Sequence, residues 1–295
     1  MKKNEFNELY GRYLDTSAIE RKLIDVVYGP MERNRLDIYY PDTKKDVYPV
    51  VIFFHGGAFF KGDKGRYQLK PALYGLERGF AVVSVNYSLA PENPLPQAFI
   101  DAARAVSYIR DHAKEYDLDE ENIVLWGESA GASLALYTGL VKEVPFDSEK
   151  DFVKVKAIID WYGPIDQLAM EKEIRKDPDS VFKNADGSSI NEMLFDKKDE
   201  ELLKALDEVN PLNYLKKENV PPVFIEHGDC DPLIPLKQSY DLRDALLQYL
   251  DESDVPITIV KGAVHGVESF ENEENLAKVF AFIEKYTGSS EQKVQ

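Results

Sequence analysis

The chain has 295 residues, of which 44% are hydrophobic and 30% are charged, a composition typical of a folded protein with one large domain or at most two small ones. Its formal net charge of −17 argues against nucleic acid and anionic membrane surfaces as partners, because both bind basic patches. The single cysteine, Cys230, excludes an intrachain disulfide.

Signals for export or membrane insertion are missing from the sequence. Lys2 and Lys3 are followed by polar residues, and not by the apolar run of a signal peptide. No stretch approaches the roughly 18 apolar residues of a membrane-spanning helix. We therefore expect a cytoplasmic protein without a membrane partner. The sequence leaves its oligomeric state open.

Short apolar runs alternate with longer helical patterns, which is typical of a mostly parallel sheet covered by helices. In chain order, strands are predicted at residues 23–28, 36–40, 50–54, 81–85, 123–126, 155–161, 223–226 and 257–260. Helices are predicted at residues 97–116, 130–141, 237–250 and 273–286. The predicted fold class is therefore α/β.

One segment, residues 164–209, interrupts this alternation. It is charged, carries the turn signals Asp177-Pro178 and Asp186-Gly187, and has only short apolar clusters. A connection of this length inside a compact domain is typically a lid or a binding element. We predict one domain over residues 1–295, in which residues 164–209 form a small helical cap that borders the mouth of the active site.

Residues 127–131 read Gly-Glu-Ser-Ala-Gly and place a serine between an apolar strand and a helix. In this context the pattern is typical of a nucleophile elbow, a turn so sharp that it leaves no room for side chains at the two glycine positions near the serine. Taken alone, it equally fits a serine that caps a helix. Together with the motifs described next, it predicts Ser129 as a nucleophile.

A serine hydroxyl is a weak nucleophile, so it needs a base within hydrogen-bond reach and an acid that orients the base. The chain has four histidines. His112 is expected on a helix surface, whereas His55 and His227, each at a strand end before a glycine, suit structural roles. His265 lies in a glycine-flanked loop after the last strand. It follows the serine, as expected of the base when the order along the chain is serine, acid, histidine.

The acid is expected in the loop after strand 223–226, where two aspartates compete. Asp231 precedes a proline, which holds it out of helical geometry and fixes the loop. Asp229 better suits a role in capping the turn with its side chain. We predict Asp231 as the acid.

Residues 55–59 read His-Gly-Gly-Ala-Phe and follow a dense apolar strand. Acyl transfer builds negative charge on the former carbonyl oxygen, and backbone N–H groups stabilise that charge. Glycines let the backbone approach the substrate closely. Alone, the segment also fits a plain β-turn. With the other motifs it predicts an oxyanion hole formed by the N–H groups of Gly57, Ala58 and Ala130.

Five motifs together resemble those of the hormone-sensitive-lipase-like esterases and of the bacterial acetyl- and feruloyl-esterase-type α/β hydrolases. They lie, in the family's order, at residues 55–59, 86–92, 127–131, 231–235 and 265–266. The resemblance covers residues 26–282. It implies an α/β-hydrolase fold and the hydrolysis of short acyl esters without a cofactor.

Three features depart from the family pattern. Ala58 stands where the lipase-like group usually has a third glycine, although the feruloyl-esterase-type relatives resemble this chain in having alanine there. Ser88 replaces an arginine that commonly follows the tyrosine. Residues 164–209 match no signature of the family, and the resemblance does not name the ester.

The leading hypothesis is a serine carboxylesterase that acts on a small-molecule ester. An amide hydrolase, such as a formamidase or a small peptidase, is an alternative because the same triad serves both reactions. A non-catalytic binding protein is disfavoured by the complete set of motifs, and a metal-dependent hydrolase by histidines without metal-ligand spacing. Candidates for the pocket lining, which could instead pack in the core, are Phe59, Phe60, Tyr87, Trp161, Tyr162 and Phe270.

Overall fold

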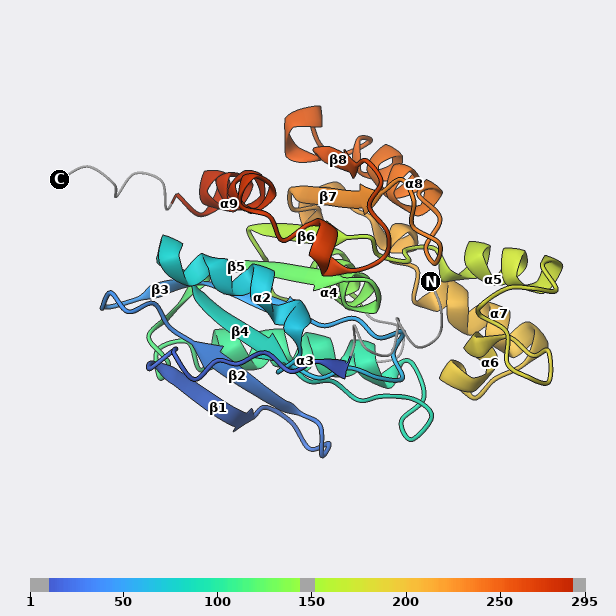
Figure 1. Cartoon of the computed structure of the whole chain (residues 1–295), viewed down its shortest axis with the longest axis horizontal. Coiled ribbons are helices and arrows are strands. Elements are labelled where there is room, and N and C mark those ends of the chain that lie inside the picture. The colour runs from blue at the N-terminus through green and yellow to red at the C-terminus, as the bar shows by residue number, and fades with distance from the viewer. Residues whose placement is uncertain (1–10, 144–151, 289–295) are drawn as a thin grey trace.

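The computed structural model describes residues 11–143 and 152–288 (Figure 1). Within these ranges the strands form one eight-stranded sheet of order β1-β2-β4-β3-β5-β6-β7-β8. The strands are β1 (Lys22–Val27), β2 (Arg35–Tyr39), β3 (Tyr48–Phe54), β4 (Ala81–Val85), β5 (Leu118–Glu128), β6 (Ala157–Trp161), β7 (Val223–Gly228) and β8 (Ile257–Val260). β2 runs antiparallel to β1 and β4, and every other neighbouring pair is parallel. The predicted mostly parallel sheet is confirmed.

Helices cover both faces of the sheet (Figure 1). On one face lie α2 (Lys70–Leu73) and α9 (Glu273–Thr287). On the other lie α3 (Gln97–Asp111), α4 (Ala130–Leu140) and α8 (Lys237–Leu246). The strands therefore sit in the middle layer of three, and both of their faces are covered.

Strand β3 shows why the strands read as continuous apolar runs. Successive side chains of a strand point to opposite faces of the sheet. Val51 and Phe53 join the core on the α9 side, whereas Ile52 and Phe54 join the core on the α3 and α4 side. All four are buried. A strand that is covered on both faces needs apolar residues at every position.

Three predicted boundaries are corrected. The helix expected at residues 97–116 ends at Asp111, and turns carry the chain to Asp117, whose positive φ of 53° directs it into β5. The strand expected at residues 123–126 begins earlier, because Leu118 already pairs with Tyr48 of β3. The helix expected at residues 237–250 ends at Leu246. Helix α2 lies in a stretch for which no element was predicted.

Residues 164–209 contain three helices, α5 (Gln167–Lys176), α6 (Ile190–Phe195) and α7 (Asp199–Glu208). They lie together at one end of the molecule, on the right in Figure 1. Buried side chains of α6 and α7, among them Leu194 and Leu202, belong to the hydrophobic core on the α3 and α4 side. The N–H of Leu95 also donates to the carbonyl of Leu194 at 2.8 Å, which fastens α6 to the loop before α3.

Within the described ranges, no helix combines the length and the hydropathy that crossing a membrane requires. A cytoplasmic location stays a prediction. The N-terminal lysines, on which the expectation about export rests, lie outside the described residues.

Candidate active site

Ser129 occupies the turn between β5 and α4 with φ 53° and ψ −124°, a conformation that residues other than glycine rarely adopt. The flanking glycines have a steric cause. A Cβ atom on Gly127 would lie 2.2 Å from the carbonyl oxygen of Gly131, and one on Gly131 would lie 2.0 Å from the carbonyl oxygen of Phe54. The glycine-x-serine-x-glycine pattern is therefore required by the close packing within this turn, at Gly127, and against the end of β3, at Gly131.

The structure brings together the predicted nucleophile, base and acid, which come from three distant segments. The Oγ atom of Ser129 lies 2.9 Å from Nε2 of His265, and Nδ1 of His265 lies 2.7 Å from Oδ2 of Asp231. Ser129 and His265 are buried. This geometry allows the hydroxyl proton to pass to the imidazole as the serine oxygen attacks an electrophilic carbon.

Asp231 is held at both of its carboxylate oxygens. Oδ1 accepts hydrogen bonds from the backbone N–H groups of Leu233 and Ile234 at 2.8 and 2.9 Å. Oδ2 lies 2.7 Å from His265 and 3.3 Å from Nε2 of His227. Burial by itself would raise the pKa of Asp231, but hydrogen bonds from His227 and His265 outweigh it and hold the pKa well below its usual range. The carboxylate is therefore charged at neutral pH.

His227, for which the sequence suggested a structural role, also contacts the acid. Its Nε2 faces the carbonyl of Ile234 at 3.0 Å as well as Asp231, so this nitrogen carries the proton. Its Nδ1 then accepts from the hydroxyl of Ser239 at 2.7 Å. The sequence did not reveal this contact, although His227 stands only four positions before Asp231.

Asp229 points elsewhere. Its Oδ1 accepts a hydrogen bond of 2.6 Å from the N–H of Gly262, in the loop that leads to His265. Asp229 therefore links two loops rather than capping its own turn, and the contact with His265 belongs to Asp231.

The two remaining histidines make no contact with Ser129. His55 is fully buried, bonded to the carbonyl of Gly56 and stacked on Tyr87, and burial lowers its pKa to about 4. His112 was expected on the surface, but it is half-buried, because its ring stacks on Tyr108 with 4.1 Å between ring centroids.

Three successive residues of the glycine loop have positive φ: Gly57 (121°), Ala58 (50°) and Phe59 (63°). Among the described residues, no acceptor is bonded to the N–H groups of Gly57, Ala58 or Ala130. Ala58 and Ala130 border the same pocket as Ser129, whereas Gly57 is not among the residues that line it. Two of the three predicted oxyanion donors thus stand beside the nucleophile.

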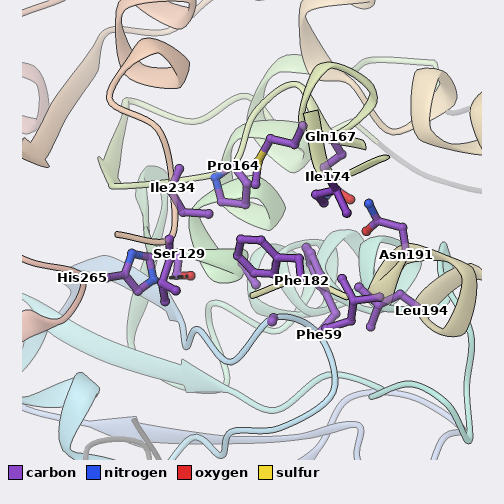
Figure 2. Close-up of a pocket in the computed structure, with 15 residues that line it drawn as sticks. Phe59, Ser129, Pro164, Gln167, Ile174, Phe182, Asn191, Leu194, Ile234 and His265 are labelled. Atoms are coloured by element: carbon purple, nitrogen blue, oxygen red, sulfur yellow. Dashed lines mark hydrogen bonds between the residues drawn. The ribbon is translucent and has the colours of Figure 1, made fainter. Parts of the chain in front are cut away.

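Ser129 and His265 open into a pocket of about 70 Å³ (Figure 2). Most of its walls are apolar, and many come from the segment 164–209. The lining residues are Ala58, Phe59, Ser129, Ala130, Pro164, Gln167, Met170, Ile174, Phe182, Ile190, Asn191, Leu194, Leu233, Ile234 and His265. The sequence did not predict the contribution of Gln167, Phe182 or Asn191, because that segment carries no recognisable motif.

Of the six aromatic residues considered as lining, only Phe59 lines this pocket. Tyr87, Trp161, Tyr162 and Phe270 are buried in the core instead. Tyr162 contacts the predicted base from the core. Its ring packs edge-on against the ring of His265 with 4.8 Å between centroids. In the part of the chain that the structure describes, no group of three or more His, Cys, Asp or Glu side chains is arranged to hold a metal ion.

The chain is similar in sequence to known esterases. The chain is 30% identical over 245 residues to a rice (Oryza sativa subsp. japonica) protein named probable isoprenylcysteine alpha-carbonyl methylesterase ICMEL1, a match that covers 78% of this chain and 54% of that protein. It is 29% identical over 253 residues to the esterase LipQ of Mycobacterium tuberculosis, covering 79% and 55%. The chain thus spans about half the length of the curated relatives that it matches.

A solved structure shares the fold. A truncated carbohydrate esterase from gut microbiota superposes with a TM-score of 0.78 at 24% identity, over 94% of this chain and 100% of that one. This likeness confirms the α/β-hydrolase fold predicted from the sequence. Residues 36–246, most of the chain, match the family named BD-FAE. The resemblance drawn from the five motifs is therefore confirmed, and the chain belongs to the BD-FAE family.

Proposed function

We propose that this chain is a serine carboxylesterase that hydrolyses short-chain acyl esters. The observation that carries the proposal is the unbroken line of hydrogen bonds from the Ser129 hydroxyl through His265 to Asp231, at the base of an apolar pocket. The names of the relatives, a methylesterase, an esterase and a carbohydrate esterase, support ester hydrolysis.

In the proposed acylation, Oγ of Ser129 attacks the carbonyl carbon of the ester while Nε2 of His265 takes the hydroxyl proton. The carboxylate of Asp231 stabilises the resulting imidazolium. The N–H groups of Ala58 and Ala130, together with that of Gly57, donate to the negatively charged oxygen. When the tetrahedral intermediate collapses, the imidazolium returns the proton to the leaving alcohol, and the acyl group stays on Ser129.

In the proposed deacylation, a water molecule attacks the acyl carbon and gives its proton to His265. The bond between the acyl carbon and Ser129 then breaks, the acid leaves, and the proton returns to Oγ. Because His265 moves every proton, the cycle needs no cofactor.

The dimensions of the pocket support a short acyl group. A volume of about 70 Å³ is well below the roughly 300–1,000 Å³ of pockets that hold drug-sized ligands. Met170, Ile174 and Phe182, all from the segment 164–209, form part of its walls. We propose that residues 164–209 act as a cap that sets the size of the substrate.

Labelling with a fluorophosphonate tests the nucleophile. The wild-type chain should gain one label at Ser129, located by peptide mass spectrometry, and Ser129→Ala should gain none. A folded wild-type chain that resists the label would favour a non-catalytic binding protein.

Rates on matched substrates separate the esterase from the amide hydrolase. We expect hydrolysis of p-nitrophenyl acetate, propionate and butyrate, a decline toward the decanoate, and much slower cleavage of p-nitroacetanilide. Acetylated xylo-oligosaccharides and methyl ferulate, measured beside them, report the preferred alcohol and acyl groups. Faster cleavage of the anilide than of the acetate would overturn the proposal.

A further inference from the structure

Two amide side chains interrupt the apolar wall of the pocket. Gln167 is the first residue of α5 and Asn191 lies in the first turn of α6. Each is only 6% exposed, and both line the pocket. Figure 2 shows them on the side of the pocket opposite Ser129 and His265.

The side-chain amide of Gln167 has no hydrogen-bond partner among the residues that the structure describes. The atoms of this amide keep some accessible surface. Because Gln167 lines the pocket, the small exposed fraction of the residue opens toward it. The amide can therefore donate to and accept from a group that enters the pocket.

Asn191 offers one free acceptor. Its Nδ2 donates to Oε2 of Glu171 at 2.9 Å, and a carboxylate oxygen can only accept, so the amide orientation is fixed. Oδ1 of Asn191 is left without a partner among the described residues and, like the Gln167 amide, is not sealed off. Glu171 is itself fully buried and is held by Ser189 and by Arg175, whose Nε lies 2.6 Å from Oε1.

The position of Gln167 is fixed by contacts with the main fold. The backbone N–H groups of Ile165 and Asp166 both donate to Oε1 of Gln238 in α8, at 2.8 and 2.7 Å. The carboxylate of Asp166 then caps α5 by accepting from the N–H of Ala169. The Gln167 amide is therefore presented by backbone that is anchored to the main fold.

We propose that the pocket binds a hydroxyl group of the substrate, which donates to Oδ1 of Asn191 and accepts from the amide of Gln167. A hydroxyl is the smallest neutral group that donates and accepts at once. The preferred esters then carry a hydroxyl remote from the ester carbon that Ser129 attacks, on either the acyl or the alcohol side. This inference rests on the proposed esterase function and names the substrate class.

Matched ester pairs test the inference on the wild-type chain. The acyl pairs are methyl butyrate with methyl 3-hydroxybutyrate and methyl hexanoate with methyl 6-hydroxyhexanoate, and the alcohol pair is butyl acetate with 3-hydroxybutyl acetate. We expect kcat/KM to favour the hydroxylated member of at least one pair by about tenfold, the gain from one or two good hydrogen bonds. The pair that responds shows whether the hydroxyl belongs to the acid or to the alcohol.

The variant Gln167→Met removes the amide without disturbing another hydrogen bond. It should lower the kcat/KM ratio of the hydroxylated to the plain ester toward one and leave the melting temperature equal or higher. Gln248→Met, a change at an exposed glutamine, should retain the preference. A purely structural role of Gln167 predicts the opposite result, a lower melting temperature with the preference intact.

The outcomes separate this inference from the proposed function. Ser129-dependent hydrolysis with equal rates within every pair would overturn the hydroxyl site and leave the esterase standing. Hydrolysis of none of the esters would overturn the proposed function itself. A preference that survives Gln167→Met would also contradict the inference, because another group would then bind the hydroxyl.

Discussion

Glu128 accepts a 2.6 Å hydrogen bond at Oε1 from the backbone N–H of Gly56, and so joins the nucleophile turn to the glycine loop. The carboxyl group is fully buried, and this burial raises its pKa. Because Gly56 leads directly to Gly57 and Ala58, one side chain beside Ser129 sets the position of the proposed oxyanion donors.

Removing the hydrogen bond between Glu128 and Gly56 should lower kcat more than it changes KM. We expect Glu128→Ala to lower kcat by roughly 10- to 100-fold, somewhat less than the loss of one whole oxyanion donor, with a smaller change in KM. Glu128→Gln keeps an acceptor oxygen and should retain most of the turnover. Steady-state kinetics on p-nitrophenyl acetate measure both variants. Equal losses in the two variants would point to the charge, and not to the hydrogen bond with Gly56.

Ser129→Ala should fold normally and lose most of the esterase activity. His265→Ala should do the same, and the double variant should cost little more than either single change, because the members of a triad act as a unit. The residual rates of the three variants form a double-mutant cycle. Losses that multiply would mean that Ser129 and His265 work independently, contrary to their 2.9 Å contact.

Asp231→Asn and Asp229→Asn form a matched pair in one loop. The first should lower kcat by about 10⁴-fold, the loss seen in a comparable triad, because His265 loses the partner that orients it. The second weakens a hydrogen bond to the N–H of Gly262, leaves the contact between His265 and Asp231 in place, and should cost about 1 kcal/mol of stability. Kinetics and thermal unfolding of both variants check this. An inactive Asp229→Asn beside a nearly normal Asp231→Asn would reverse our choice of acid.

Phe182 should limit the length of the group that the pocket accepts. It borders both the pocket and a larger outer groove, which share Met170, Ile174, Phe182 and Leu233 as walls. Phe182→Ala should join the two spaces and move the optimum of a p-nitrophenyl ester series toward longer acyl chains. Val181→Ala, at a neighbour that is 70% exposed and lines only the groove, is the control and should keep the wild-type profile. A profile unchanged in Phe182→Ala would show that the boundary lies elsewhere.

Glu226 should make the fold less stable as the pH rises. Burial raises its pKa to about 8, even though the side chain of Asn275 donates to Oε2 at 3.0 Å. The folded state therefore keeps a proton that the unfolded state releases near its ordinary pKa of 4.5, so stability falls between about pH 4.5 and pH 8. Glu226→Gln, which cannot ionise, should gain on the order of 3–5 kcal/mol over wild type above pH 8 and little at pH 4.

Thermal or denaturant unfolding of both proteins across this pH range measures the effect. Glu252→Gln, at an exposed position, serves as the control and should follow wild type. A difference between Glu226→Gln and wild type that stays constant with pH would contradict the raised pKa of Glu226.

The sequence by itself determined the parts of this protein that depend on local sterics and on apolar patterning. Gly127 and Gly131 mark the serine turn because any Cβ there would strike backbone atoms. Continuous apolar runs such as residues 50–54 reveal strands covered on both faces. His265 is predicted as the base from its place after the last strand, in the order serine, acid, histidine along the chain.

Only the tertiary structure decided which side chains meet across the chain. The contacts of Glu128 with Gly56, of His227 with Asp231, and of Gln167 with the pocket join segments whose spacing carries no period or motif. Hydrogen bonds and pocket walls of this kind depend on the three-dimensional arrangement of helices packed on a sheet. The segment 164–209 shows this most clearly. It carries no recognisable motif, and only the folded structure shows that its side chains line the pocket beside Ser129.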